Sequence, residues 1–354
     1  MRLATLAFAA SLLTATSAPA FDGWRLQDTQ ILPSNGSSWD YLHLDPTQPR
    51  LFIGNRKEGL KVYDLRSKKI VKVIDQTEQH SSNGVTLAPD LDLGISNNED
   101  GTITPFRLSS LQAAEAIKLA NELDNSHYDP STKRLIVNVA PDKDGTGLVV
   151  LDAPSLKVVG TIKVPTLKPE HADFDGNGVM FLAGRDTDTV YRIDTRQMTV
   201  TASWSTPGCA RTNSLVYDAG NRRILLGCRG SDTVKPSFAV MNADSGQIVY
   251  TAEIGGGVDG IVFDPRTKRV FLSCGVSAVI NIFEQLSADS YRPIEAVGTQ
   301  AGARTLAYDP VMERLYSVTA EGTADLSKKV VTSVSPFYAN VFFRNTFKVL
   351  TYAK

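Results

Sequence analysis

The sequence predicts an all-β fold, a single seven-bladed β-propeller with four-stranded blades, and three observations lead to this prediction. One phrase occurs seven times: a polar residue, an alternating apolar strand, an Asp-Pro turn or a variant of it, and a second strand. The copies follow one another every 41 to 46 residues, the length of a blade of four short antiparallel strands. The last copy lacks a fourth strand, and the N-terminal segment contains a strand that no other copy uses, so the two ends together can close a ring. The position after the turn aspartate, or after its equivalent, is occupied by Pro46, Pro89, Pro130, Gly176, Ala219, Pro265 and Pro310.

Each copy contains the chemistry of a strand reversal. The aspartate caps the turn through its side chain, and the proline presets φ, so one strand ends and the next runs back. Third and fourth strands follow with period-two alternation, for example over residues 59–65 and 70–75. The one segment that suggests a helix, a short one, is Leu111–Ala120.

The two ends of the chain predict how the ring closes. After the seventh copy, the chain has one clear strand left, Thr346–Tyr352, so the last blade lacks a fourth strand. The N-terminal segment Trp24–Leu32 is a strand that no other blade claims. We therefore expect it to pair as the outer strand of the last blade, which leaves only short, protected edges. A long insertion, Thr319–Asn345, lies inside that blade.

The first twenty residues have the pattern of a secretory signal peptide. Arg2 is followed by an apolar run, and Ala18-Pro19-Ala20 forms an A-x-A cleavage site. Cleavage after Ala20 leaves residues 21–354 as one propeller domain, in the periplasm or outside the cell. No later stretch approaches the roughly 20 continuous apolar residues that a membrane helix needs, so no transmembrane segment is expected.

Charge and cysteine content limit the partners and the compartment. The formal net charge of −1 becomes −2 when Arg2 is removed, which argues against nucleic acid and anionic membranes as partners. We expect a monomer. Of three cysteines, Cys209 and Cys228 flank neighbouring strands and are predicted to form a disulfide, with Cys274 a buried free thiol. Pairing of Cys228 with Cys274 is the alternative.

Several phrases resemble the YVTN-type, YncE-like family of periplasmic β-propeller repeat proteins. The resemblance covers nearly the whole mature chain and implies the fold and export; it leaves activity open, because propellers host many unrelated functions. The chain departs from the family pattern over residues 106–122 and in the insertion. The matching phrases are Trp39-Asp40-Tyr41, Pro169-Glu170, Gly227-Cys228-Arg229, Val258-Asp259, Ala303-Arg304-Thr305 and Phe347-Lys348-Val349-Leu350.

One aligned column is polar in all seven copies, five residues before the turn aspartate. Innermost strands of a propeller converge on the central channel, so this column predicts a ring at the channel mouth and the first place to seek a ligand site. The alternative is that polar side chains simply suit a wet channel. The ring comprises Asp40, Asn83, Asp124, Glu170, Asn213, Asp259 and Arg304.

Three functions follow from this ring, and the sequence does not decide whether the protein is an enzyme. The preferred one is a binding or scaffold protein for an unknown small molecule or protein partner, basic ligands included. The second is a sugar-lactone hydrolase of the gluconolactonase type. There Glu170, Asn213 and Asp259 would hold Ca²⁺ or Mg²⁺, and Asp259 or Glu170 would be the base. The third is an accessory protein of an exported redox system. Arg304 is a candidate contact for an anionic group.

The histidines and the aromatic residues of the insertion are further candidates. His171 follows Glu170 and is the best histidine for a ligand or metal contact. His43 and His127 share a column with a whole blade between them, and His80 lies in a loop near the mouth. The insertion contains four aromatic residues that are candidates to cap the channel or bind a partner: Phe337, Tyr338, Phe342 and Phe343.

Overall fold

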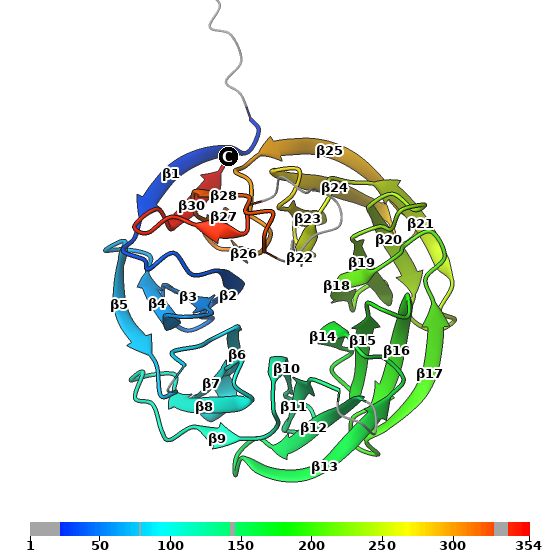
Figure 1. The fold of residues 1–354 in the computed structure, drawn as a ribbon. Coiled ribbons are helices and arrows are strands. Elements are labelled where there is room, and N and C mark those ends of the chain that lie inside the picture. Colours follow the sequence, from blue (N-terminus) through cyan, green and yellow to red (C-terminus); the bar gives the residue numbers. More distant parts are fainter. Residues whose placement is uncertain (1–21, 78, 142–145, 329–338) are drawn as a thin grey trace, which may run out of the picture.

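The computed structural model describes residues 22–77, 79–141, 146–328 and 339–354, which form seven four-stranded antiparallel sheets around a central axis (Figure 1). This confirms the predicted seven-bladed all-β propeller. Within the described residues, the one helical element is a 3-10 turn, η1 (Pro89–Leu91), at the blade-two variant of the Asp-Pro turn. The predicted signal peptide lies outside the described residues.

Blades one to six each use four consecutive strands, numbered from the channel outward. Blades one and two are β2 (Trp39–Leu44), β3 (Arg50–Asn55), β4 (Gly59–Asp64), β5 (Lys69–Ile74), then β6 (Gly84–Ala88), β7 (Leu93–Asn97), β8 (Thr102–Arg107) and β9 (Ile117–Lys118). Blades three and four are β10 (Leu123–Asp129), β11 (Arg134–Val139), β12 (Thr146–Asp152), β13 (Lys157–Val164), then β14 (Pro169–Phe174), β15 (Val179–Gly184), β16 (Thr189–Asp194) and β17 (Thr199–Ser205). Blades five and six are β18 (Thr212–Asp218), β19 (Arg223–Cys228), β20 (Ser237–Asn242), β21 (Ile248–Glu253), then β22 (Val258–Asp264), β23 (Arg269–Cys274), β24 (Val279–Ser287) and β25 (Ser290–Gly298).

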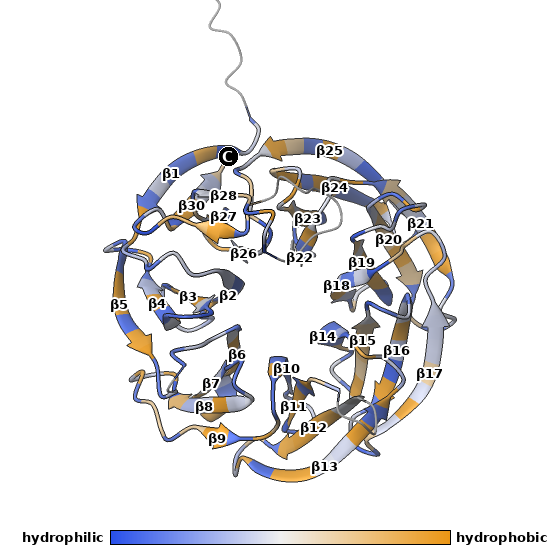
Figure 2. Ribbon diagram, in the orientation of Figure 1, coloured by the Kyte–Doolittle hydropathy of each residue, from blue (hydrophilic) through white to orange (hydrophobic). Residues whose placement is uncertain are grey.

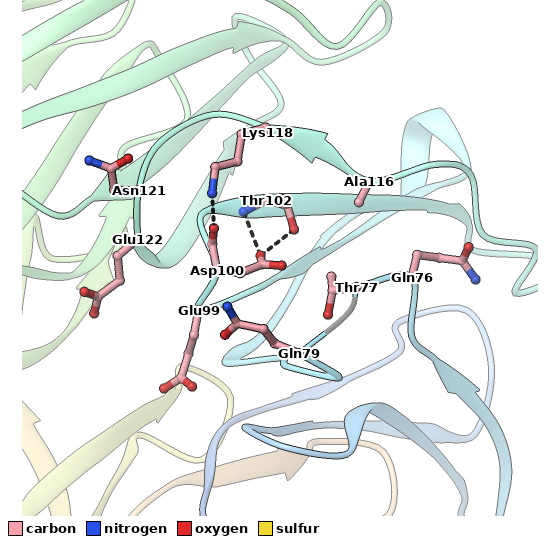
Figure 3. Close-up of a pocket in the computed structure, with 10 residues that line it drawn as sticks. All are labelled: Gln76, Thr77, Gln79, Glu99, Asp100, Thr102, Ala116, Lys118, Asn121 and Glu122. Carbon is pink, nitrogen blue, oxygen red and sulfur yellow. Dashed lines mark hydrogen bonds between the residues drawn. The ribbon is translucent and has the colours of Figure 1, made fainter.

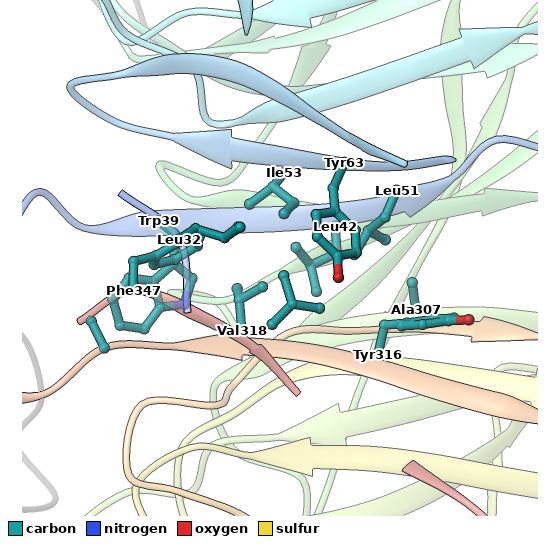
Figure 4. Close-up of a cluster of buried hydrophobic side chains, with 12 residues drawn as sticks. Leu32, Trp39, Leu42, Leu51, Ile53, Tyr63, Ala307, Tyr316, Val318 and Phe347 are labelled. Atoms are coloured by element: carbon teal, nitrogen blue, oxygen red, sulfur yellow. The ribbon is translucent and has the colours of Figure 1, made fainter. Parts of the chain in front are cut away.

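The seventh blade joins the two ends of the chain, as predicted. It contains β26 (Leu306–Asp309), β27 (Arg314–Thr319), β30 (Lys348–Ala353) and, outermost, the N-terminal β1 (Arg25–Ile31). β1 runs antiparallel to β30, with Arg25 opposite Ala353. Between blades seven and one, apolar side chains including Trp39 and Phe347 form a buried cluster (Figure 4). Strand pairing and an apolar core therefore both close the ring.

Burial follows the position of each strand in its blade. All six residues of β3 are buried, because neighbouring blades cover both of its faces. Outer strands have one face toward solvent, and exposed and half-buried residues alternate along β17. Figure 2 shows the same alternation of hydrophilic and hydrophobic residues along the outer strands. The period-two pattern of the sequence is therefore clearest at the rim.

The turn aspartates also tie neighbouring blades together. The carboxylate of Asp129 accepts hydrogen bonds from Ser131 in its own turn and, at 2.7 Å, from the hydroxyl of Thr195 in the next blade. The carboxylate of Asp218 accepts one at 2.7 Å from the amide of Gln285, also one blade further on. The end of the channel that carries these turns is called the turn end below.

The helix predicted for Leu111–Ala120 is wrong. Leu111 has a φ of +58°, a left-handed turn that a helix does not contain, and β9 pairs with β8 as the fourth strand of blade two. The blade needs an outer strand to satisfy the backbone groups of β8, and this need outweighs the helical preference of the alanine-rich segment.

The cysteine predictions are confirmed. Cys209 and Cys228 form a disulfide with a Cα–Cα distance of 5.2 Å, and Cys274 is a buried free thiol. Cys209 precedes β18 and Cys228 ends β19, so the bond clips the entry loop of blade five to its second strand.

Candidate functional site

The seven residues of the predicted ring, called the polar ring below, all lie where the inner strands begin, at the end of the channel opposite the turns. In five blades the pairing between the first and second strands slips at this column, which is a β-bulge. A bulge bends its strand and turns the side chain of the extra residue away from the regular alternation. The same distortion therefore recurs around the mouth. The ring residues in these bulges are Asp40, Asp124, Glu170, Asn213 and Asp259.

Sequence reasoning missed the arginines that pair with this ring. Three arginines stand directly after the second strand of blades one, four and five, at one aligned position. Arg185 Nη1 lies 2.7 Å from Glu170 Oε1, and Arg229 Nη2 lies 2.5 Å from Asp259 Oδ1. The shared position was visible in the repeat alignment and would have identified them. The three pairs are Arg56 with Asp40, Arg185 with Glu170, and Arg229 with Asp259.

Arg304, the one basic member of the polar ring, connects three blades. Its Nε lies 2.7 Å from Asp259 Oδ2 in blade six, and its Nη2 lies 2.5 Å from the carbonyl oxygen of Trp39 and 3.4 Å from Asp40 Oδ1 in blade one. Because it stands in blade seven, it bridges the place where the ring of blades closes.

Burial divides the mouth into two layers. The side chains of Asp40, Glu170 and Asp259 are only 4–6% exposed. The side chains of their arginine partners, Arg304 included, are 19–34% exposed. The mouth therefore presents partly exposed guanidiniums over three buried carboxylates, whereas Asp124, the fourth ring carboxylate, is half-buried.

The two asparagines of the polar ring have different roles. Asn213 Nδ2 donates to Asp259 Oδ1 at 2.7 Å, and its Oδ1 lies 3.4 Å from Arg185 Nη1. Asn213 thus links the Arg185–Glu170 pair of blade four to the Arg229–Asp259 pair, which joins blades five and six. Asn83 Nδ2 donates to the backbone carbonyl of Leu123 at 3.1 Å, which ties blade two to blade three.

The ring carboxylates titrate very differently from one another. Burial and the charge of Asp124 raise the pKa of Glu170 to about 8, against the opposing charges of Arg185 and Arg229. Burial and Asp40 raise the pKa of Asp124 to about 6. Burial also acts to raise the pKa of Asp259, but Arg229 and Arg304 outweigh it and hold that pKa well below its ordinary value.

A cavity of about 390 Å³ lies in the channel beneath the polar ring, lined by residues from all seven blades. Tyr41 of blade one and His171 of blade four reach across it and meet edge-on, with ring centroids 4.8 Å apart. Gly84 leaves room for this, because a Cβ there would lie 2.8 Å from Tyr41 Cβ. Burial and the ring carboxylates raise the pKa of Tyr41 well above its ordinary value, so its phenol stays protonated.

Three histidines line this cavity, although the sequence separates two of them by a whole blade. They are His43, His127 and His171. Burial and His171 lower the pKa of His43 to about 4 and that of His127 to about 3, so both imidazoles are neutral at pH 7. The Nδ1 of His171 lies 3.2 Å from the carbonyl oxygen of Asn213 and must donate, because a carbonyl only accepts. The closed ring brings together side chains that are distant along the chain.

In the predicted cation site, Asn213 connects the two acidic residues. Its Nδ2 donates to Asp259, and its Oδ1 contacts Arg185, the partner of Glu170. A divalent cation among these groups would also face the guanidiniums of Arg185 and Arg229, which repel it. Among the described residues, no group of three or more His, Cys, Asp or Glu side chains is placed to hold a metal ion. As arranged, these residues do not fit a Ca²⁺ or Mg²⁺ site.

A second cavity, of about 490 Å³, lies at blade two, lined by that blade and by the loops that connect it to blades one and three (Figure 3). Its lining is polar, and it includes Glu99, Asp100, Lys118 and Glu122. Glu99 Oε1 lies 3.0 Å from Arg56 Nη1, so this cavity adjoins the polar ring at blade one.

The insertion of blade seven packs partly on blade one. β28 (Gly322–Thr323) pairs with β29 (Val341–Phe342), and the Phe342 ring lies 4.8 Å from that of Trp39. Phe342 is half-buried and belongs to the joint between the blades, whereas Phe343 is exposed. Phe337 and Tyr338 lie outside the described residues. His80 is exposed, with its Nδ1 2.5 Å from Asp75 Oδ2.

No family model matches this chain, and no curated protein matches it. Many solved structures share its fold. The U3-55K structure has a TM-score of 0.72 at 12% identity over 93% of this chain and 99% of its own. A chain of the mitotic checkpoint complex gives 0.71 at 13% over 90% and 96%, and one of Kuenenia stuttgartiensis hydrazine synthase gives 0.68 at 14% over 81% and 94%. At such identities the likeness establishes a seven-bladed, WD40-like propeller and nothing finer.

Helices long and apolar enough to span a bilayer are absent from the described residues.

Proposed function

We propose that this protein is an exported, non-catalytic binding or scaffold propeller of the YVTN, YncE-like type, whose ligand docks on the polar ring. The β-propeller is a fold that commonly serves as an interaction scaffold, and its functions lie in sites built on the ring of blades. The signal-like residues 1–20 and the disulfide support an exported location, because disulfides persist in oxidising compartments.

The observation that supports the site best is the convergence of side chains from separate blades on one mouth. If the ring served only to hydrate the channel, polar residues in any arrangement would be sufficient. Here five bulges recur in one column, and three arginines from a second column pair with its carboxylates. Organised, partly exposed polar groups around an opening are typical of a binding surface.

The test of this proposal is a thermal-shift screen of the mature chain with and without an intact ring. The panel contains amino acids, sugar lactones, nucleotides, carboxylic acids and CaCl₂. We expect at least one molecule to raise the melting temperature of the wild type and of Arg222→Gln, a control at the turn end, but not of Arg304→Gln. A panel in which every stabilising molecule acts equally on all three chains would refute the ring as the site.

Export is tested separately by expressing the whole chain in a Gram-negative host. We expect the periplasmic fraction to hold a chain that begins at Phe21. An unprocessed chain confined to the cytoplasm would contradict export.

Metal-dependent lactone hydrolysis is the alternative enzyme function, and the arginines beside Glu170 and Asp259 weigh against it. It requires that Ca²⁺ bind the purified chain and raise its melting temperature, and that Glu170→Gln and Asp259→Asn each abolish that binding. Absence of bound metal and of any calcium shift would exclude it.

A further inference from the structure

We propose that the mouth of the channel binds a small organic anion, whose carboxylate or phosphate oxygens are held by Arg185 and Arg229, with Arg304 beside them. This inference rests on the proposed function and specifies the charge of its ligand. It departs from the expectation that the ring, with four carboxylates, would suit cations or basic ligands.

The first argument is the spacing of the guanidinium groups. Arg185 Nη1 approaches the Oδ1 of Asn213 at 3.4 Å, and the Nδ2 of the same amide donates to the Asp259 carboxylate that Arg229 contacts. The amide of Asn213 and one oxygen of the Asp259 carboxylate therefore lie between the two arginines. Arg304 contacts the other oxygen of Asp259 at 2.7 Å, so three guanidiniums from blades four, five and seven surround one amide and one carboxylate.

Arg185 and Arg229 have N–H groups that their contacts with described residues do not use. An arginine has five N–H donors. The contacts of Arg185 with described residues use Nη1 alone, and those of Arg229 use Nε and Nη2. The remaining donors are not among the buried unpaired atoms, and both side chains are about a quarter exposed, at 27% and 26%. Donors that face solvent from two converging forks match the geometry of carboxylate and phosphate.

The third argument is the balance of charge at neutral pH. The polar ring, its arginine partners and Glu99, which pairs with Arg56, together contain four arginines and five carboxylic acids. The Glu170 carboxyl has a pKa raised to about 8, so it is largely protonated at pH 7 and contributes little negative charge. The surrounding surface adds Lys168, which is exposed and acts electrostatically on Asp124. The layer that a ligand meets is therefore net positive, even though the whole chain has a formal charge of −1.

The experiment measures binding of malonate, citrate and inorganic phosphate to the mature chain by calorimetry at pH 7 and constant ionic strength. Malonamide serves as the uncharged analogue of malonate. We expect at least one anion to bind, malonamide not to bind, and Arg185→Gln and Arg229→Gln to weaken binding at least about tenfold, because each removes a charge-assisted contact. Arg222→Gln, which alters an arginine paired with Asp244 at the turn end, should bind as the wild type does. The carboxylate and phosphate arms decide which anion is preferred.

Glu170→Gln gives a test that misfolding cannot imitate. This change removes the negative charge that Glu170 acquires as the pH rises through about 8, so we expect the variant to bind anions more strongly than the wild type above pH 8 and much as the wild type does near pH 7. Unchanged or weaker binding in Glu170→Gln above pH 8, or equal binding of malonate and malonamide, would overturn the anion proposal. A ring-dependent cationic or neutral ligand from the thermal-shift panel would overturn it while leaving the proposed function standing. A panel with no ring-dependent ligand would overturn both.

Discussion

The two ends of the channel are built from the same strands but held together in different ways. At the turn end, every turn aspartate is bonded within its own turn, and three of them, Asp129, Asp218 and Asp264, also accept a hydrogen bond from a neighbouring blade. At the ring end, carboxylates meet arginines from their own blade or from the next ones, and Arg304 reaches two other blades. The turn end repeats a local motif, whereas the ring end is assembled from single residues that differ from blade to blade.

This difference indicates which end maintains the fold and which end is available for binding. Local hydrogen bonds inside a turn stabilise the blade and occupy the carboxylate of the turn aspartate. Burying carboxylates under partly exposed guanidiniums costs desolvation, so each such contact stabilises the fold less. Recognition of a ligand therefore explains their presence better than stability does.

Loss of a turn aspartate should destabilise the protein most. Asp129→Ala removes the acceptor for Ser131, Thr132 and Thr195 at a fully buried position, and we expect a loss of about 4 kcal/mol in the free energy of unfolding. Asp124→Asn at the ring end is the matched variant and should change stability by less than about 1 kcal/mol. Urea unfolding followed by circular dichroism measures both. Equal losses would remove the distinction between the ends.

Removal of the disulfide should be the next largest effect. Cys209 and Cys228 are 19 residues apart, and closing a loop of that length stabilises a protein by about 3 kcal/mol through the unfolded chain. Cys209→Ala with Cys228→Ala should lose that amount and also weaken anion binding, because Arg229 follows Cys228 directly. If the double variant keeps the wild-type free energy of unfolding and the wild-type affinity for anions, the disulfide contributes to neither stability nor the position of Arg229.

Arg304→Gln should have a smaller effect on stability than on ligand binding. The change leaves Asp259 with Arg229 and the amide of Asn213 as partners, so we expect a loss of about 2 kcal/mol, less than for a buried charge left alone. Guanidinium chloride unfolding is unsuitable because its cation competes for carboxylates; urea gives the value. A loss as large as that of Asp129→Ala would place the ring among the elements that hold the fold.

The raised pKa of Glu170 predicts that the folded protein becomes less stable in alkaline solution. The folded chain holds this proton up to about pH 8, whereas the ordinary pKa is 4.5. Its stabilising contribution is therefore complete below about pH 4.5 and is lost as the pH rises through 8. Glu170→Gln should flatten the fall of the melting temperature between pH 6 and 9. Parallel curves for variant and wild type would contradict the assignment.

His127 predicts an effect of opposite sign. Its pKa is about 3 in the folded chain against 6.5 ordinarily, so the unfolded chain gains a proton first as the pH falls. Stability should decline from about pH 6.5 toward 3, and His127→Asn should reduce that decline. Melting temperatures at pH 7 and pH 4.5 test this, with His80→Asn, an exposed histidine, as the control.

The sequence predicts what is local and repeated, and misses what the closed ring brings together. The Asp-Pro turns, the blade period and the closure by Trp24–Leu32 follow from patterns within one blade or at the two ends. The polar ring also follows, because its column is polar in every copy. Arg185 and Arg229 were missed because their role depends on carboxylates of a neighbouring strand or of the next blade. His43 and His127 were set aside for a related reason, since a whole blade separates them along the chain.

A crystal structure of the mature chain grown with malonate or phosphate tests the central claim most directly. We expect difference density for one anion between Arg185 and Arg229, with the carboxylates of Glu170 and Asp259 beneath it. An anion found only at the turn end, at Lys118 of the cavity at blade two, or at scattered surface lysines would contradict the account.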